Sequence, residues 1–376
     1  MEFLKAAVEL VLNKKRKLLE PEGFLCQFFA AKIMVPFYEP FKPSRFVCKP
    51  TGALIITMGG EIEVLSQECS APIATFPKFS GVGRTSSLLD EELLLLGDDD
   101  LGTRKRYISI QKPREGLLAM KYTIEDFPLP ESPHQHLSLV SKNDLTVLGG
   151  KFKSRGKLSK FTWTEFSLKW ENGSMFNYDF INNACSVKLG VDMHIIFGGE
   201  RKSEDQQTNG RHVVKINTTD EIAYELNPLT YGRSSHGCQL LNDKIVLVAG
   251  GFALNGENQS EILQDELYNI TSQEVIKVLD RNQSLGRAQH AMVKIKERIL
   301  ALGGMDSNNN TPSQIAEFNT TTNAWTELAK RLHSTNTSEL IAIPLPAASL
   351  DCVPDCSCGI ANKSVRIFNG TEVGDV

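Results

Sequence analysis

The stretch KIVLVAGG, residues 244–251, is the clearest copy of a unit that repeats along this 376-residue chain. Each copy is an apolar run that ends in a glycine pair or a near variant of one. The six pairs are Gly59-Gly60, Gly97-Asp98, Gly149-Gly150, Gly198-Gly199, Gly250-Gly251 and Gly303-Gly304. Successive pairs are 38, 52, 49, 52 and 53 residues apart, a spacing typical of repeated four-stranded units.

The residues around 244–251 predict four strands in a fixed order. Residues 236–241 precede the glycine strand, and residues 265–270 and 274–279 read as a hairpin after a polar loop. The same order recurs in other copies, so we predict an all-β protein, a β-propeller of four-stranded blades. The predicted blade units are residues 45–76, 84–127, 136–180, 184–226, 235–279 and 289–328.

The two ends of the chain bear on how the ring closes. Residues 1–22 predict a short amphipathic helix, and residues 23–376 a single propeller domain. Strands predicted at 24–37 and within 339–370 lack a glycine pair of their own. A seventh blade built from both termini would leave no open sheet edge, so we favour seven blades, with six as the alternative.

Composition excludes several partners. A formal net charge of -4 and a pI near 6.0 provide no general attraction to nucleic acid or to an anionic membrane surface. No apolar run is long enough to span a bilayer, so we expect no membrane insertion. The glycine pairs are followed by polar loops and not by helices, which argues against phosphate binding.

The repeat resembles the Kelch motif, in which a double glycine precedes an aromatic pair and an Arg or His leads into the next repeat. Phe318 and Trp325 match the aromatic pair, and Tyr268 matches its first member one repeat earlier. Arg233-Ser-Ser-His236 and Arg287-Ala-Gln-His290 match the segment that leads into a blade. Departures are Asp98, in place of a second glycine, and Tyr224, near a Trp position. The resemblance covers about Arg45 to Leu328 and implies a propeller of the galactose oxidase and Kelch-like type.

The resemblance also implies where a ligand would bind. Arg45, Arg84, Arg233 and Arg287 each lie at the start of a blade, in the region that lines the binding surface of Kelch propellers. Four guanidinium groups around the channel mouth would suit an acidic peptide, so we expect a non-catalytic module that binds another protein. His236 and His290, in the same segments, complete the candidate ligand-binding set. The alternative is that each arginine only bonds neighbouring loop carbonyls, with the two histidines as interblade hydrogen-bonding residues.

Catalysis has less support in the sequence. Some Kelch-type propellers are metal-dependent enzymes, but neither a His-Glu-x-x-His helix nor a Gly-x-Ser-x-Gly elbow occurs in this chain. A small-molecule enzyme is therefore the least favoured alternative. We predict no catalytic residue, no metal site and no cofactor.

The eight cysteines leave three readings open. Cys26 and the C-terminal group Cys352, Cys356 and Cys358 lie in the two proposed closing segments, where they could form a disulfide, remain free thiols or bind a metal. Cys48, Cys185 and Cys238 occupy first-strand positions in different blades. We expect these three to be too far apart to pair and to be buried as small apolar groups.

Ten Asn-x-Ser/Thr triplets exceed the roughly three expected by chance and point toward a secreted glycoprotein with a structural or lectin-like role. Against it, no signal peptide is evident, so the chain as it stands reads as cytoplasmic. Turn chemistry accounts for the four triplets at Asn172, Asn217, Asn269 and Asn319. The acceptor candidates that we single out are Asn258, Asn282, Asn309 and Asn336.

Overall fold

The computed structural model describes residues 183–332 with gaps at 203–206, 221, 256–257, 282–284, 307 and 309. It also describes strand segments between residues 50 and 172, and residues 340–346 and 367–369. Strands and turns dominate these residues, and none of them forms a helix long and apolar enough to cross a membrane. The predicted helix at 1–22 lies outside the described residues.

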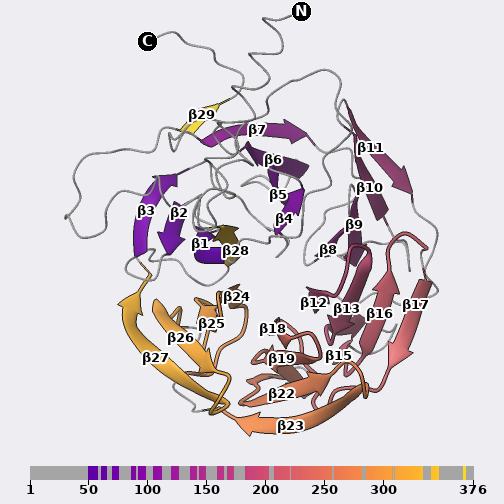
Figure 1. Ribbon diagram of the computed structural model, residues 1–376, viewed down its shortest axis with the longest axis vertical. Coiled ribbons are helices and arrows are strands. Elements are labelled where there is room, and N and C mark those ends of the chain that lie inside the picture. The colour runs from indigo at the N-terminus through magenta and orange to yellow at the C-terminus, as the bar shows by residue number, and fades with distance from the viewer. Residues whose placement is uncertain are drawn as a thin grey trace, which may run out of the picture.

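The described strands form blade-like sheets around a common centre, which confirms the predicted all-β propeller of four-stranded blades (Figure 1). Three sheets come from residues 185–331, each an antiparallel meander. The first runs outward through β12 (Cys185–Lys188), β13 (Met193–Phe197), β16 (Val213–Asn217) and β17 (Ile222–Leu226). The second runs through β18 (Gly237–Asn242), β19 (Ile245–Ala249), β22 (Gln264–Asn269) and β23 (Glu274–Asp280). The third runs through β24 (Ala291–Ile295), β25 (Arg298–Leu302), β26 (Gln314–Asn319) and β27 (Ala324–Arg331).

The other three sheets are built from the earlier part of the chain and its C-terminal strands. One contains β8 (His136–Val140), β9 (Asp144–Gly149), β10 (Ser159–Thr164) and β11 (Ser167–Asn172). Another contains β4 (Ser86–Leu89), β5 (Glu92–Asp98), β6 (Lys105–Gln111) and β7 (Met120–Asp126), with β29 (Ile367–Asn369) parallel to β7. The last contains β28 (Leu340–Pro346), β1 (Pro50–Thr57), β2 (Glu61–Leu65) and β3 (Ser70–Thr75).

The ring is closed by a strand from the far end of the chain. β28 lies innermost and pairs antiparallel with β1, from Thr57 opposite Leu340 to Pro50 opposite Pro346. The predicted role of this segment is therefore corrected, because β28 completes the first blade and does not begin a seventh. Residues 24–37, its predicted partner, lie outside the described residues.

Six sheets account for the described propeller strands, which fits the six-blade alternative. Their inner strands contact one another in the order β28, β4, β8, β12, β18, β24 and back to β28. β29 also departs from the predicted seventh blade, since residues 367–369 pair in parallel with β7 and not with β28.

The core lies between neighbouring blades. Ile195 and Phe197 on β13 pack with Val246 and Val248 on β19, and Tyr268 completes this layer. The second strand of a blade is covered on both faces by its neighbours, so its apolar residues run without alternation. This is the physical reason for the apolar runs that precede the glycine pairs.

Candidate functional site

Arg233 and Arg287, which we predicted to bind a ligand, are buried between blades. Their exposed fractions are 0% and 1%. The Arg233 guanidinium donates from Nη1 to the Gly250 carbonyl at 3.0 Å and from Nη2 to the Gln264 carbonyl at 3.0 Å. Arg287 repeats these bonds one blade later, donating to the carbonyls of Gly303 at 3.3 Å and Gln314 at 3.0 Å.

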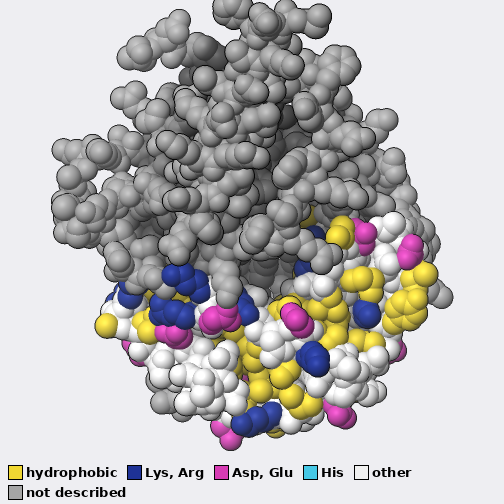
Figure 2. Space-filling model, viewed as in Figure 1, with side chains coloured by type: hydrophobic (Ala, Val, Ile, Leu, Met, Phe, Trp, Pro, Cys, Tyr) yellow, Lys and Arg dark blue, Asp and Glu magenta, His cyan; other side chains and the backbone are white. Residues whose placement is uncertain are grey.

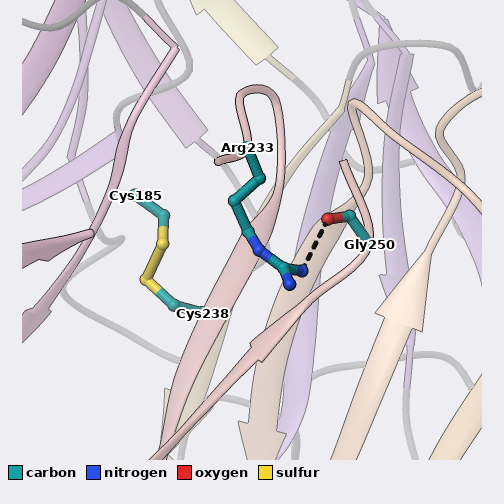
Figure 3. The surroundings of a disulfide bond; sticks show 4 residues. All are labelled: Cys185, Arg233, Cys238 and Gly250. Atoms are coloured by element: carbon teal, nitrogen blue, oxygen red, sulfur yellow. Dashed lines mark hydrogen bonds between the residues drawn. A yellow bond between two sulfur atoms is a disulfide. The ribbon is translucent and has the colours of Figure 1, made fainter. Parts of the chain in front are cut away.

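The glycine pairs explain how each arginine spans two blades. The Arg233 carbonyl accepts a hydrogen bond from the Gly199 N–H of the preceding blade at 2.7 Å, while its guanidinium reaches Gly250 of its own blade (Figure 3). Gly251 N–H donates in the same way to the Arg287 carbonyl at 3.1 Å. Gly250 and Gly251 have φ of 63° and 94°, which fits the predicted need for glycine. Each arginine therefore links consecutive glycine pairs.

The charge of Arg233 is balanced by a buried carboxylate. Its Nη2 lies 2.6 Å from Oε1 of Glu266, and neither side chain is exposed. Glu266 also accepts bonds from the backbone N–H groups of Thr230 at 2.6 Å and Tyr231 at 3.2 Å. Burial lowers the pKa of Arg233, and the Glu266 charge opposes that shift.

Arg287 is also buried, but its charge is less fully balanced by neighbouring carboxylates than that of Arg233. Burial lowers its pKa to about 10, Arg281 adds repulsion, and Glu327 and Glu261 act in the opposite direction. The group therefore keeps its charge at neutral pH. Because both described arginines are bonded to backbone within the wall, the ligand-binding prediction does not hold for them, and the alternative of bonding to loop carbonyls describes them. Arg45 and Arg84 lie outside the described residues.

His236 and His290 pack against the glycine pairs and are 5% and 6% exposed. A β-carbon at Gly198 would lie 2.8 Å from Cε1 of His236, and one at Gly250 would lie 3.1 Å from Cε1 of His290. Each ring thus occupies the space that the glycine leaves open. The two histidines lie within the blade contact and not on an open surface.

Cys185 and Cys238 form a disulfide, which corrects the prediction that they are too far apart (Figure 3). Their Cα atoms are 5.9 Å apart, although 53 residues separate them in sequence. Both lie on innermost strands, β12 and β18, and inner strands of neighbouring blades converge around the centre. This convergence is a property of the closed ring and is absent from the local spacing of the sequence.

The remaining predicted modification and cysteine sites are placed only in part. Asn258 begins β21 (Asn258–Glu261). The other acceptor candidates and the predicted disulfide cysteines lie outside the described residues: Asn282, Asn309, Asn336, Cys26, Cys352, Cys356 and Cys358. In the part of the chain that the structure describes, no group of three or more metal-ligating side chains occurs.

Two additional hairpins lie on the face of the propeller where the chain enters the first strand of each blade. Each connects the second and third strands of a blade, where the sequence predicted only polar loops. They are β14 (Glu200–Lys202) with β15 (Gln207–Asn209), and β20 (Phe252–Asn255) with β21. β15 contacts β20, and Ser234 pairs with Phe252 at the base of the second hairpin. Hairpins and blade starts thus form one continuous surface, which we call the hairpin face.

A cavity opens on the opposite face, between the blades of β18–β23 and β24–β27. Its volume is about 520 Å³. Its lining residues are Leu241, Asn242, Ile245, Leu267, Ile276, Lys277, Glu297, Thr320 and Asn323. Lys277 and Glu297 are its charged lining residues, and the others are apolar or neutral polar. This lining does not form a set of groups that converges on a reacting atom.

Apolar side chains gather on the surface drawn in Figure 2, with Lys and Arg interspersed among Asp and Glu. Exposed large apolar residues occur on outer strands, including Tyr224 at 53% and Ile276 at 45%. On this view the described blades present a mixed surface and not a continuous cationic one.

Comparison with known proteins supports the fold. Residues 286–331 match the family model of the Kelch motif. A solved structure entitled "Structure of YjhT" is similar, with a TM-score of 0.56 and 15% sequence identity, over 76% of this chain and 98% of that one. No curated protein matches the sequence. At 15% identity the likeness establishes the fold alone, and it assigns no role to individual residues of this chain.

Proposed function

The chain is a Kelch-repeat β-propeller, and we propose that it is a non-catalytic module that binds another protein through its hairpin face. Kelch repeats commonly mediate contacts between proteins. The observation that carries the proposal is the pair of ordered hairpins, β14–β15 and β20–β21, which contact each other beside the blade starts. Loops held by a rigid scaffold are where binding specificity concentrates.

The proposal does not retain the acidic peptide. That expectation rested on exposed guanidinium groups, and both described ones are buried.

The test shortens the hairpins without touching the blades. In one variant, residues 254–259 are replaced by Asn-Gly, so that the pair Ala253 and Ser260 flanks a two-residue turn. In a second, residues 202–207 are replaced in the same way between Arg201 and Thr208. The matched control, Ser272→Ala with Gln273→Gly, alters a turn on the opposite face, where Gln273 has a φ of 58° that glycine adopts readily.

The measurement is quantitative affinity capture of proteins from lysates of the cells in which this protein is naturally expressed. Some proteins should be captured equally by wild type and by the control. Either shortened variant should capture at least about tenfold less of these proteins, which corresponds to roughly 1.4 kcal/mol of binding free energy. Circular dichroism would verify that all four proteins are folded. Equal capture by wild type and by both shortened variants would reject the hairpin face as the binding surface.

A further inference from the structure

Three Asn-x-Thr triplets occupy the same place in successive blades. Asn217, Asn269 and Asn319 are the last residues of β16, β22 and β26, the third strand of each sheet. The turn that follows leads to the outer strand, on the face opposite the hairpins. The hydroxyl residues two positions later, Thr219, Thr271 and Thr321, are all exposed.

Each asparagine holds its turn through one atom. Oδ1 of Asn269 accepts from the N–H groups of Thr271 at 2.8 Å and Ser272 at 3.2 Å. Oδ1 of Asn319 accepts from the N–H groups of Thr321 at 2.8 Å and Thr322 at 3.0 Å. Oδ1 of Asn217 accepts from those of Thr219 at 3.0 Å and Asp220 at 3.1 Å. The carbonyl side of the amide therefore makes the turn, and a substituent on Nδ2 leaves these bonds intact.

Turn chemistry explains the asparagines but not the threonines. The residue two positions on contributes its backbone N–H to the turn, and every residue except proline supplies that group. Aspartate would also serve in place of asparagine. A hydroxyl at this position in all three blades is what an N-glycosylation acceptor requires.

The Cys185–Cys238 disulfide is an independent observation that points to the same compartment. It joins the innermost strands of two neighbouring blades, β12 and β18, whereas the three turns lead to outer strands. Stable disulfides form in oxidising environments such as the lumen of the secretory pathway, where N-glycosylation also takes place.

We propose that Asn217, Asn269 and Asn319 are N-glycosylated and that this chain matures in the secretory pathway. The amide Nδ2 loses one proton and forms a bond to C1 of an oligosaccharide, while the bond from C1 to the diphosphate of a lipid-linked donor breaks. The thiols of Cys185 and Cys238 pass two electrons and two protons to a disulfide oxidant by exchange. For Asn217, whose Nδ2 donates to Oδ2 of Asp220 at 2.6 Å, the substituted amide keeps one N–H for that bond.

The glycans would cover one face and leave the other open. The three turns lie at the ends of the blades opposite the hairpin face, so attached sugars would not obstruct binding there. A glycan on Asn319 would also screen the cavity, whose wall includes the adjacent Thr320. This inference concerns modification and compartment and does not depend on the proposed protein-binding role.

The first test is peptide mapping of the full chain isolated from the cells that encode it. Treatment with a peptide N-glycosidase in heavy-oxygen water should convert all three asparagines to labelled aspartate. A non-reducing digest should contain the linked Cys185 and Cys238 peptides. An asparagine among the three that stays unconverted, or recovery of both cysteines as free thiols, would overturn the proposal.

A matched pair of variants separates the glycan from the turn. Thr271→Ala destroys the acceptor triplet and keeps Asn269, whereas Thr271→Ser retains the triplet. Expressed in the same cells, the alanine variant should lose the mass of one glycan and the serine variant should keep it. Asn269→Asp preserves the turn acceptor and should also lose that glycan. An unchanged mass in the alanine variant would refute modification at this turn.

Discussion

Arg233 acts as a structural residue because its two ends serve different blades. Its carbonyl accepts from Gly199 and its guanidinium donates to Gly250 and to Glu266. A buried ion pair adds little net stability over an apolar pair, yet removing one member leaves the other charge buried and uncompensated. The cost of losing the arginine should therefore be large.

We expect Arg233→Met to lower the free energy of unfolding by about 3–5 kcal/mol, measured from urea unfolding midpoints. The control is Arg298→Met, which removes a partly exposed ion pair with Glu317 at 2.7 Å and should cost less than about 1 kcal/mol. Similar small losses in both variants would contradict the structural role assigned to Arg233.

His194 should make stability depend on pH. The ring is 3% exposed, and burial lowers its pKa from 6.5 to about 4, with Lys188 adding to the effect. The unfolded chain therefore binds a proton more readily than the folded one. The stability from the neutral ring is fully present above pH 6.5 and is lost as the pH falls toward 4, by about 2–3 kcal/mol.

The measurement is the urea midpoint of wild type and His194→Leu between pH 7 and pH 4. The leucine variant should show a flatter dependence across this range, whatever its stability at pH 7. Parallel curves for the two proteins would contradict the assignment.

At the scale of elements, an outer strand is tied to the neighbouring blade through one aromatic residue. Trp325 on β27 donates from Nε1 to Oδ2 of Asp265 at 2.6 Å. Arg281 binds the same carboxylate at 3.0 Å and lies 4.6 Å from the centre of the Trp325 ring. This set of contacts explains why a Trp follows the aromatic of the third strand.

We expect Trp325→Phe to cost about 1.5–3 kcal/mol, since it removes a bond to a buried carboxylate. Tyr224 on β17 stands near the corresponding position but is 53% exposed, so Tyr224→Phe should change stability by less than about 0.5 kcal/mol. Thermal unfolding of both variants provides the comparison. Equal shifts would show that the bond to Asp265 is not the source of the effect.

At the scale of the whole molecule, the ring is held by β28 and by the disulfide. β28 joins residues 340–346 to residues 50–57, and the disulfide closes a 53-residue separation. Both connect segments distant in sequence, but only the covalent disulfide persists in the unfolded chain and lowers its entropy. The β28–β1 pairing forms on folding, at the entropic cost of closing a long loop.

We expect the double variant Cys185→Ala with Cys238→Ala to lose up to about 4 kcal/mol relative to the oxidised protein, from the length of the loop that the bond closes. A dithiol reductant should lower the unfolding midpoint of wild type and leave that of the double variant unchanged. If the reductant has no effect on wild type, the disulfide does not stabilise the fold.

Prediction from sequence succeeded where a property belongs to one strand. The apolar runs and glycine pairs predicted four-stranded blades because a strand buried on both faces needs unbroken apolar residues. Prediction was wrong where two segments had to be placed together. The roles of Arg233, Cys185 and β28 depend on the convergence of neighbouring blades, which local spacing does not contain.

The repeat of apolar run and glycine pair was enough to establish an all-β propeller, since strand period, turn chemistry and the need for positive φ are local. Only the packed ring showed that the arginines at the blade starts are enclosed, that two inner-strand cysteines meet, and that the C-terminal strand completes the first blade. The guanidinium bonds of Arg233 and Arg287 join residues 16 to 33 positions apart, and the disulfide joins residues 53 apart. β28 pairs residues 340–346 with residues 50–57. Such contacts form when the blades close around a common centre, and that closure is a property of the tertiary structure.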